Sequence, residues 1–123
     1  MVTRILAIDD SRTIRTLLTQ TLQNAGFEVS TAVDGVEGVQ KFHDEHADLV
    51  ITDVNMPNKD GFGVLADIRA SSKNQAVPVL VLTTESGADL KDRARKAGAT
   101  GWIVKPFEDD ALVAVIRRLT GVV

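Results

Sequence analysis

The stretch of sequence that decides the fold is LVITDVNMPNKDG, residues 49–61. It opens with the aliphatic run Leu49-Val50-Ile51, which suits a strand buried on both faces, as in a parallel sheet. Pro57 restricts the residue before it to extended geometry, and residues 58–61 are turn-forming. Asp53 therefore stands where a central strand ends, which is where open α/β sheets bind ligands. From this stretch alone, an Asp that begins a turn or caps a helix is an equally good interpretation.

The composition predicts one globular domain and excludes several kinds of site. Hydrophobic residues make up 44% of the 123 residues and charged residues 25%, which argues against disorder and predicts a single domain over residues 1–123. The chain has no Cys, which excludes disulfides, thiolate metal sites and Cys nucleophiles. The two His, His43 and His46, have no third ligand nearby that would complete a metal site.

Charge and hydropathy argue against nucleic acid and membrane as partners. The net charge is −3, and no basic cluster is flanked by aromatic residues, so we expect no nucleic-acid partner. No apolar run approaches the ~20 residues that cross a bilayer, and Arg4 interrupts the early apolar stretch, so we expect no membrane insertion. The lack of Cys is compatible with a reducing compartment, and we expect a cytoplasmic protein.

Apolar runs of strand length alternate with helical patterns along the whole chain. Besides the opening stretch, the predicted strands are Arg4–Ile8, Phe27–Ala32, Pro78–Leu82 and Gly101–Val104. The predicted helices cover about residues 12–25, 35–43, 61–70, 88–97 and 108–119. The apolar residues that define their buried faces are Ile14, Leu17, Leu18 and Leu22; Val36, Val39 and Phe42; Phe62, Leu65 and Ile68; and Leu112, Val115, Ile116 and Leu119.

The helix predicted over residues 88–97 differs from the others. Its one large aliphatic residue is Leu90, whereas Lys91, Arg93, Arg95 and Lys96 make it basic. Such a helix buries little surface, so we expect it to be loosely held and partly free to move. A plain solvated helix is compatible with the same pattern.

Five strands that alternate with five helices predict a doubly wound α/β fold. Strict alternation with short connections implies right-handed crossovers and a parallel sheet covered on both faces. A flavodoxin-like and a half-Rossmann strand order both fit this pattern. The letters G-x-G-x-x-A occur from Gly61, but they do not follow their strand directly, so we do not interpret them as a dinucleotide-binding motif.

In such a fold the carboxyl ends of the strands meet at one edge, which we call the rim. Polar residues that can carry chemistry follow four of the five predicted strands. Each residue is placed there by the position of its strand rather than by its chemistry. They are Asp9 and Asp10 after the first strand, Asp53 after the third, Thr83 and Thr84 after the fourth, and Lys105 after the fifth.

Three carboxylates on one rim require compensation. At ~4 Å each ionised pair costs about 4 kcal/mol at an effective dielectric near 20, so either pKa values rise or a cation binds. Oxygen ligands without His or Cys favour Mg²⁺. A carboxylate, a Lys, a hydroxyl and a metal together suggest phosphoryl transfer onto the carboxylate. The alternative is purely structural: Lys105 pairs with Asp53, and Thr83 caps a helix.

These residues together resemble the receiver domain of two-component response regulators. The resemblance covers the whole chain and includes the rim residues, Val54–Gly61, Asp34-Gly35, Ala97-Gly98-Ala99 and Lys105-Pro106-Phe107. Because no output domain follows in the sequence, the chain looks most like the stand-alone, CheY-type chemotaxis regulators. The resemblance implies a flavodoxin-like (CheY-like) sheet in the order 2-1-3-4-5.

The resemblance assigns roles to the acidic residues. Asp53 would be the nucleophile that takes a phosphoryl group from a phosphohistidine on a sensor histidine kinase of the CheA type. Asp10, Asp53 and the backbone carbonyl of Asn55 would bind Mg²⁺ directly, and Asp9 would bind it through water. Asn55 and Glu85 hold positions that influence how fast water removes the phosphoryl group.

The resemblance also implies a switch. Lys105 would pair with the phosphoryl oxygens, and the Lys105–Pro106 peptide bond would be cis. The Thr83 hydroxyl would move toward the phosphoryl group, and Trp102 could then turn inward. The family usually has Tyr or Phe where Trp102 stands, so a Trp that merely packs at the surface is the alternative. Thr84 replaces a smaller residue, and we expect it to slow turnover by narrowing access.

The favoured function is a phosphorylation-driven signalling switch, not an enzyme, that acts on a flagellar motor switch protein or another protein effector. A phosphate sink that drains a shared kinase has the same acceptor chemistry and is the first alternative. A phosphatase with an aspartyl-phosphate intermediate would need an acid two residues past the nucleophile, where this chain has Asn55. A flavin-binding protein is disfavoured because the acidic rim would repel an FMN phosphate.

Overall fold

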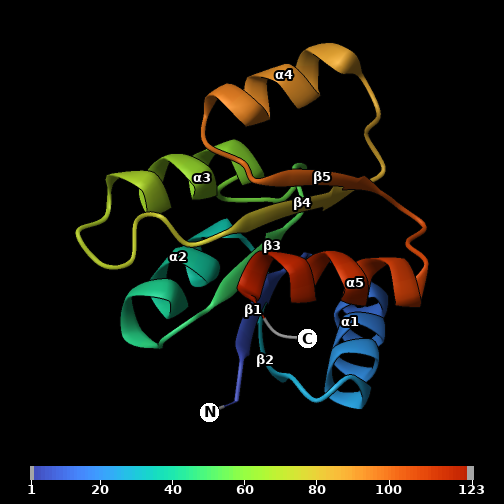
Figure 1. Ribbon diagram of the computed structural model, residues 1–123. Coiled ribbons are helices and arrows are strands. Elements are labelled where there is room, and N and C mark those ends of the chain that lie inside the picture. Colours follow the sequence, from blue (N-terminus) through green and yellow to red (C-terminus); the bar gives the residue numbers. More distant parts are fainter. Residues whose placement is uncertain (1, 122–123) are drawn as a thin grey trace.

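The computed structural model describes residues 2–121, in which five strands and five helices alternate along the chain (Figure 1). The strands are β1 (Arg4–Ile8), β2 (Glu28–Ala32), β3 (Leu49–Thr52), β4 (Val79–Thr83) and β5 (Gly101–Val104). The helices are α1 (Arg12–Asn24), α2 (Gly35–Asp44), α3 (Gly61–Ala70), α4 (Ala88–Lys96) and α5 (Asp109–Thr120). Every boundary lies within two residues of the prediction.

The sheet is parallel throughout, in the order β2-β1-β3-β4-β5. This order confirms the predicted flavodoxin-like fold and rules out the half-Rossmann order. None of the helices formed by residues 2–121 has the length and apolar character that a membrane crossing requires.

The register of the central strands places the rim residues beside one another. Ile8 lies opposite Ala32 on one side and Thr52 on the other. The same ladder continues past the strand ends, since the backbone N–H of Asp53 donates to the Ile8 carbonyl at 3.0 Å and that of Asp9 donates to the Ala32 carbonyl at 3.1 Å. The first residues beyond β1 and β3 are therefore neighbours.

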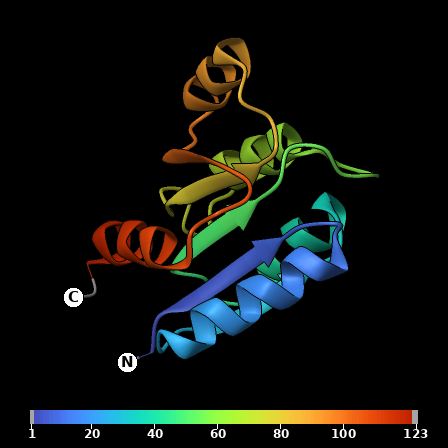
Figure 2. The same ribbon diagram turned by 90° about the vertical axis from the view of Figure 1, so that its right-hand side faces the viewer.

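Helices cover both faces of the sheet, as predicted for a doubly wound fold. Leu6 and Ile8 of β1 pack in the core beneath α2 and α3, whereas Ile5 and Ala7 face α1 and α5. Figure 2 shows α1 and α5 on one side of the sheet and α2 and α3 on the other. Side chains of β3 and β4 are buried on both faces, which explains their uninterrupted aliphatic sequences.

Two residues predicted on buried helix faces are exposed instead. The side chain of Val36 is 48% exposed, because the buried stripe of α2 runs through Gly35, Gly38 and Phe42. Leu17 is 45% exposed. The buried stripe of α1 centres on Leu18 and Leu22, and successive residues of a helix are rotated by about 100°, so Leu17 points away from this stripe.

Gly38 sets the distance between α2 and the sheet. A Cβ at this position would lie 2.4 Å from Cδ1 and 2.7 Å from Cγ1 of Ile8, whose side chain is fully buried. A β-branched side chain in a packed core has no free rotamer to turn into. Only a residue without a side chain therefore allows α2 to lie this close to β1.

We expect Gly38→Ala to lower the free energy of unfolding by about 1–3 kcal/mol, because the added methyl group overpacks this contact. Urea unfolding at neutral pH measures the change. Gln40→Ala, at an exposed position of the same helix, is the matched control and should stay within about 0.5 kcal/mol of wild type. A Gly38→Ala protein as stable as wild type would contradict the close approach.

Candidate functional site

Four of the predicted site residues lie at the rim, at or directly after the end of a strand, whereas Trp102 lies within β5. Asp9 follows β1, Asp53 follows β3, and Lys105 follows β5. Thr83 is the last residue of β4 rather than the first residue after it, and its side chain is fully buried. Four segments that are distant in the sequence thus meet at one edge of the sheet.

Lys105 joins the two buried carboxylates of the rim. Its Nζ lies 2.8 Å from Oδ2 of Asp9 and 3.0 Å from Oδ2 of Asp53. Burial lowers the pKa of Lys105, but the hydrogen bonds that its ammonium donates to both carboxylates, together with their charges, outweigh burial and leave the pKa raised. The Lys105–Asp53 ion pair that the structural alternative predicted is present, and Lys105 forms a second ion pair with Asp9. The next residue, Pro106, is joined to Lys105 by a cis peptide bond.

Backbone donors hold the remaining oxygens of both carboxylates. Oδ1 of Asp9 accepts the backbone N–H of Ser11 at 2.9 Å, and Oδ1 of Asp53 accepts that of Val54 at 2.7 Å. Burial raises the pKa of Asp9 despite the bonds from Lys105 and Ser11, and the nearby charge of Asp53 adds to the increase. Asp9 thus carries its negative charge at an energetic cost.

The rim carboxylates form a plausible site for a divalent cation. Carboxylate oxygens of Asp9, Asp10 and Asp53 all lie within 4.8 Å of one another, and Asp10 is exposed. Three carboxylates and the Lys105 ammonium leave a net charge of −2, which a divalent ion would neutralise. The donors are hard oxygens, as Mg²⁺ prefers. The residues present therefore fit the metal that the sequence predicted.

Glu85 connects the rim to Trp102 through its backbone and its side chain. Its backbone N–H donates to Oγ1 of Thr83 at 3.3 Å, and its carbonyl accepts the Trp102 indole N–H at 3.0 Å. Its carboxylate accepts the side-chain amide of Asn55 at 3.0 Å. Glu85 is thus hydrogen-bonded to Thr83, Trp102 and Asn55, all of which the resemblance singled out. Thr84, between Thr83 and Glu85, is exposed.

A second connection at the rim was missed by sequence reasoning. Asn58, in the loop that follows Asp53, has a left-handed backbone (φ 69°) and donates its side-chain amide to Oδ2 of Asp34 at 2.6 Å. Oδ1 of Asp34 caps α2 by accepting the Glu37 N–H. The sequence marked Asp34-Gly35 as a motif and Asn58 as a turn residue. The sequence gives no sign that Asp34 and Asn58 are bonded, since they lie 24 residues apart.

Gly61 allows the same loop to return against Asp53 and Val54, directly after β3. A Cβ on Gly61 would lie 2.3 Å from the Asp53 carbonyl oxygen, and the Gly61 N–H donates to the Val54 carbonyl at 2.8 Å. Gly61 thus serves to close the loop that follows β3. This role agrees with the interpretation that its G-x-G-x-x-A letters are not a dinucleotide motif.

A family model described as the response regulator receiver domain matches residues 5–117, so the chain belongs to this family of signalling switches in two-component systems. Among curated relatives, the transcriptional regulatory protein PrrA of Mycobacterium leprae is 38% identical over 94% of this chain. The chain spans about half of PrrA's length, 49%. Protein PilG of Pseudomonas aeruginosa is 32% identical over 93% of this chain and 84% of its own.

Solved structures agree with this assignment. The chemotaxis protein CheY4 of Vibrio cholerae is 41% identical, with a TM-score of 0.92, and the match covers 97% of this chain and 99% of that one. The response regulator TrrA of Thermotoga maritima, solved in complex with Mg²⁺-BeF, is 35% identical, with a TM-score of 0.85 over 96% of this chain and 99% of its own. The predicted CheY-like receiver fold is therefore confirmed.

The raised pKa of Asp9 leads to a stability prediction. In the absence of Mg²⁺ we expect Asp9→Asn to raise the Tm at pH 7, because the ionised carboxylate destabilises the folded state. A raised pKa in the folded state means that wild-type stability falls as the pH rises from the ordinary value of 3.8 through the folded value. The increase in Tm from Asp9→Asn should grow as the pH rises through this range, and it should vanish at pH values below 3.8.

Thermal unfolding followed by circular dichroism at several pH values checks this prediction. Asp44→Asn, at an exposed position at the end of α2, removes the same formal charge and should not show the gain. Added Mg²⁺ should stabilise wild type more than Asp9→Asn. A variant that is less stable than wild type at pH 7 would show that the Lys105 bond outweighs the cost of burial.

Proposed function

We propose that this chain is a phospho-acceptor response regulator in which Asp53 takes a phosphoryl group from the phosphohistidine of a sensor histidine kinase. The observation that carries the proposal is the contact of one buried Lys105 ammonium with both Asp9 and Asp53 beside the exposed Asp10. A purely structural ion pair with Lys105 would need only one carboxylate. The three on this rim provide an acceptor and a cation site together.

In the proposed reaction an Asp53 carboxylate oxygen attacks the phosphorus atom. The new O–P bond forms as the N–P bond breaks, and the leaving imidazole keeps the electron pair. The acyl phosphate carries about −1.5 to −2 charge at neutral pH. Lys105, already 3.0 Å from Asp53, lies close enough to pair with the new oxygens. The backbone N–H of Val54 orients the attacking carboxylate.

Mg²⁺ is the proposed metal, held by Asp10, Asp53 and the backbone carbonyl of Asn55, with Asp9 acting through water. When bound, it would neutralise charge that develops on the transferred phosphoryl group. The grouping of three carboxylates supports this assignment. The Mg²⁺-BeF complex of the related TrrA structure supports it as well.

The proposed switch runs from Thr83 to Trp102 through Glu85. A Thr83 hydroxyl that turned toward a phosphoryl oxygen would no longer accept the Glu85 N–H in its present geometry. The Glu85 carbonyl, which holds the Trp102 indole, would then be free to shift. A change from 1:99 to 99:1 between two states needs roughly 5.5 kcal/mol, which a few charge-assisted hydrogen bonds can supply.

Residues beside the acceptor would set the lifetime of the phosphoryl group. The Asn55 side chain is bonded to Glu85, so both are held near the path that water would take to Asp53. Thr84 is exposed at the same edge and would narrow that path. Asn55 is an amide rather than an acid, which argues against the phosphatase alternative.

The proposed partners are a CheA-type kinase and, downstream, a flagellar motor switch protein or another protein effector. We propose a cytoplasmic receiver domain over residues 1–123, and the similarity to the chemotaxis protein CheY4, over 99% of that protein's chain, supports the receiver domain. The phosphate sink remains the alternative, since it needs the same acceptor without a non-kinase partner. Affinity for such a partner would distinguish the two.

The acceptor assignment is tested by incubating the protein with phosphoramidate and Mg²⁺ and measuring its intact mass. Phosphoramidate presents the same P–N bond as phosphohistidine. We expect a gain of one phosphoryl group that EDTA abolishes and that Asp53→Asn lacks. Asp44→Asn is the matched control and should gain mass like wild type. A gain that persists in Asp53→Asn, or no gain in wild type, would contradict the proposal.

A further inference from the structure

The helix α4 is attached to the rest of the molecule mainly at one end. Among its nine residues, all within the described part of the chain, Ala94 alone is buried. The residue before its first turn, Gly87, provides no side-chain cap, whereas α1, α2, α3 and α5 each begin at a capping side chain. Figures 1 and 2 both show α4 standing apart, above β5.

Arg69, at the end of α3, holds the carboxyl end of α4. Its guanidinium donates twice to the Gly98 carbonyl, at 3.1 Å from Nε and 2.7 Å from Nη2. It also donates to the carbonyls of Gln75 and Val77, at 2.6 and 2.7 Å, just before β4 begins. Burial lowers the pKa of Arg69, yet a guanidinium stays charged, so these are charge-assisted bonds.

Gly98 fits this contact closely. Its backbone is left-handed (φ 105°), and a Cβ there would lie 2.8 Å from Nε of Arg69. The guanidinium of Arg93 adds a second contact to α3, since its Cζ lies 3.8 Å from the centre of the Phe62 ring. The second half of α4 is therefore tied to α3 by two arginines and by the buried Ala94.

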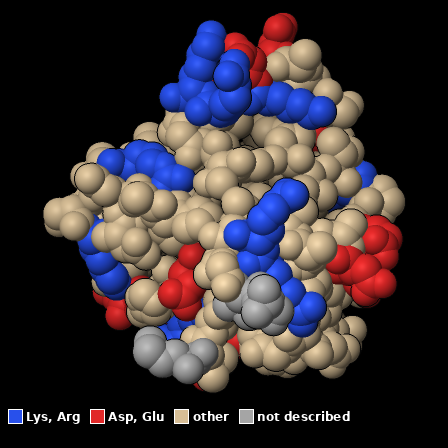
Figure 3. Space-filling view, viewed as in Figure 1, with Lys and Arg blue, Asp and Glu red and all other residues tan. Residues whose placement is uncertain are grey.

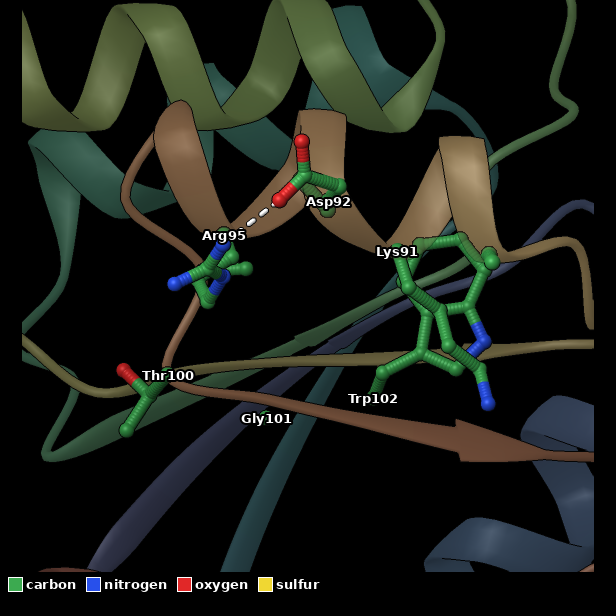
Figure 4. A pocket seen from close by; sticks show the side chains of 9 residues that line it. Lys91, Asp92, Arg95, Thr100, Gly101 and Trp102 are labelled. Atoms are coloured by element: carbon green, nitrogen blue, oxygen red, sulfur yellow. Dashed lines mark hydrogen bonds and ion pairs between the residues drawn. The ribbon is translucent and has the colours of Figure 1, made fainter.

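The first half of α4 is held by fewer contacts, since Leu90 packs against the core but is only partly buried. An open cavity of about 400 Å³ lies between α4 and β5. It runs along both halves of the helix, since Ala88 and Lys91 line it as well as Arg95. Figure 4 shows Trp102 and Lys91 at one end of the cavity and the Arg95–Asp92 pair at the other. The Asp92 ion pairs join residues within α4, so they do not fix the helix to the sheet. Lys and Arg side chains gather on its outer surface, beside acidic side chains (Figure 3).

We propose that Arg69 is a positioning residue that fixes the carboxyl end of α4, so that the helix opens first at its amino-terminal turn. A helix of nine residues is about 13 Å long, so a small rotation at Gly98 displaces the Gly87 end much further. The Gly87 end lies two residues after the segment Thr83–Glu85 in the sequence. The inference concerns the protein without a phosphoryl group and does not rest on the proposed acceptor chemistry.

Amide hydrogen exchange measured by NMR, without Mg²⁺ or phosphodonor, tests the proposal. Three amides report on α4: Lys91 N–H, bonded to the Gly87 carbonyl; Ala97 N–H, bonded to Arg93; and Ala99 N–H, bonded to Ala94. In wild type we expect Ala97 and Ala99 to be protected at least tenfold more than Lys91. In Arg69→Gln, protection at Ala97 and Ala99 should fall at least tenfold, with less than a threefold change at Lys91.

Two further variants keep the test interpretable. Arg69→Lys retains the charge but not the planar fork of donors, and should give an intermediate loss at Ala97 and Ala99. Arg118→Gln, at an exposed position of α5, removes an equal charge and should change none of the three amides by more than twofold. Protection is expressed relative to Val81 in β4, which corrects for any change in global stability.

Two results would overturn the proposal. In wild type, equal protection at Lys91 and Ala97 would show that α4 opens as one unit. In Arg69→Gln, a loss shared equally by all three amides would show that Arg69 stabilises the fold generally rather than one end of α4. Because no phosphodonor is present, neither result depends on whether Asp53 is an acceptor.

Discussion

The interaction on which the site depends is the contact of the Lys105 ammonium with the carboxylates of Asp9 and Asp53. The parallel register of β1 and β3 forces these two acids together at the rim, and Asp10 adds a third carboxylate. One lysine cannot neutralise three acids, so the rim keeps a net negative charge that suits a divalent cation. Burial raises the pKa of Asp9, and the nearby charge of Asp53 adds to the increase.

The parts of the structure that would respond to a change at the rim are held less firmly than the rim itself. Thr83 is fully buried, but its hydroxyl bonds only to a backbone N–H of Glu85 among the described residues, and Glu85 in turn holds the Trp102 indole. Beyond Glu85, the first turn of α4 lacks a side-chain cap and lies over an open cavity. The firm attachment of α4 to Arg69 lies at its other end.

The sequence predicted the elements and the rim residues because each rests on local pattern, whereas local pattern left two strand orders open and the family resemblance implied the observed one. Aliphatic runs such as Leu49–Ile51 identify doubly buried strands, and parallel topology then brings the residues after them to one edge. The burial of Val36 and Leu17 was predicted wrongly, because it depends on how each helix is rotated against the sheet. In α2 the buried stripe runs through Gly38 and Phe42, and in α1 it runs through Leu18 and Leu22. The bonds of Asn58 to Asp34 and of Arg69 to Gly98 join residues 24 and 29 apart in sequence, and no local pattern pairs them.

The central claim is that the acidic rim and the Trp102 face respond together. Trp102 is the only Trp in the chain, so its fluorescence reports on that face alone. The most direct measurement is a titration with Mg²⁺ followed by beryllofluoride, which mimics a bound phosphoryl group, in wild type and Asp53→Asn. The account predicts a saturable change in wild type that requires Mg²⁺ and is absent in Asp53→Asn. Binding of beryllofluoride, measured by fluorine NMR, with no change in Trp102 fluorescence would contradict the link between the rim and Trp102.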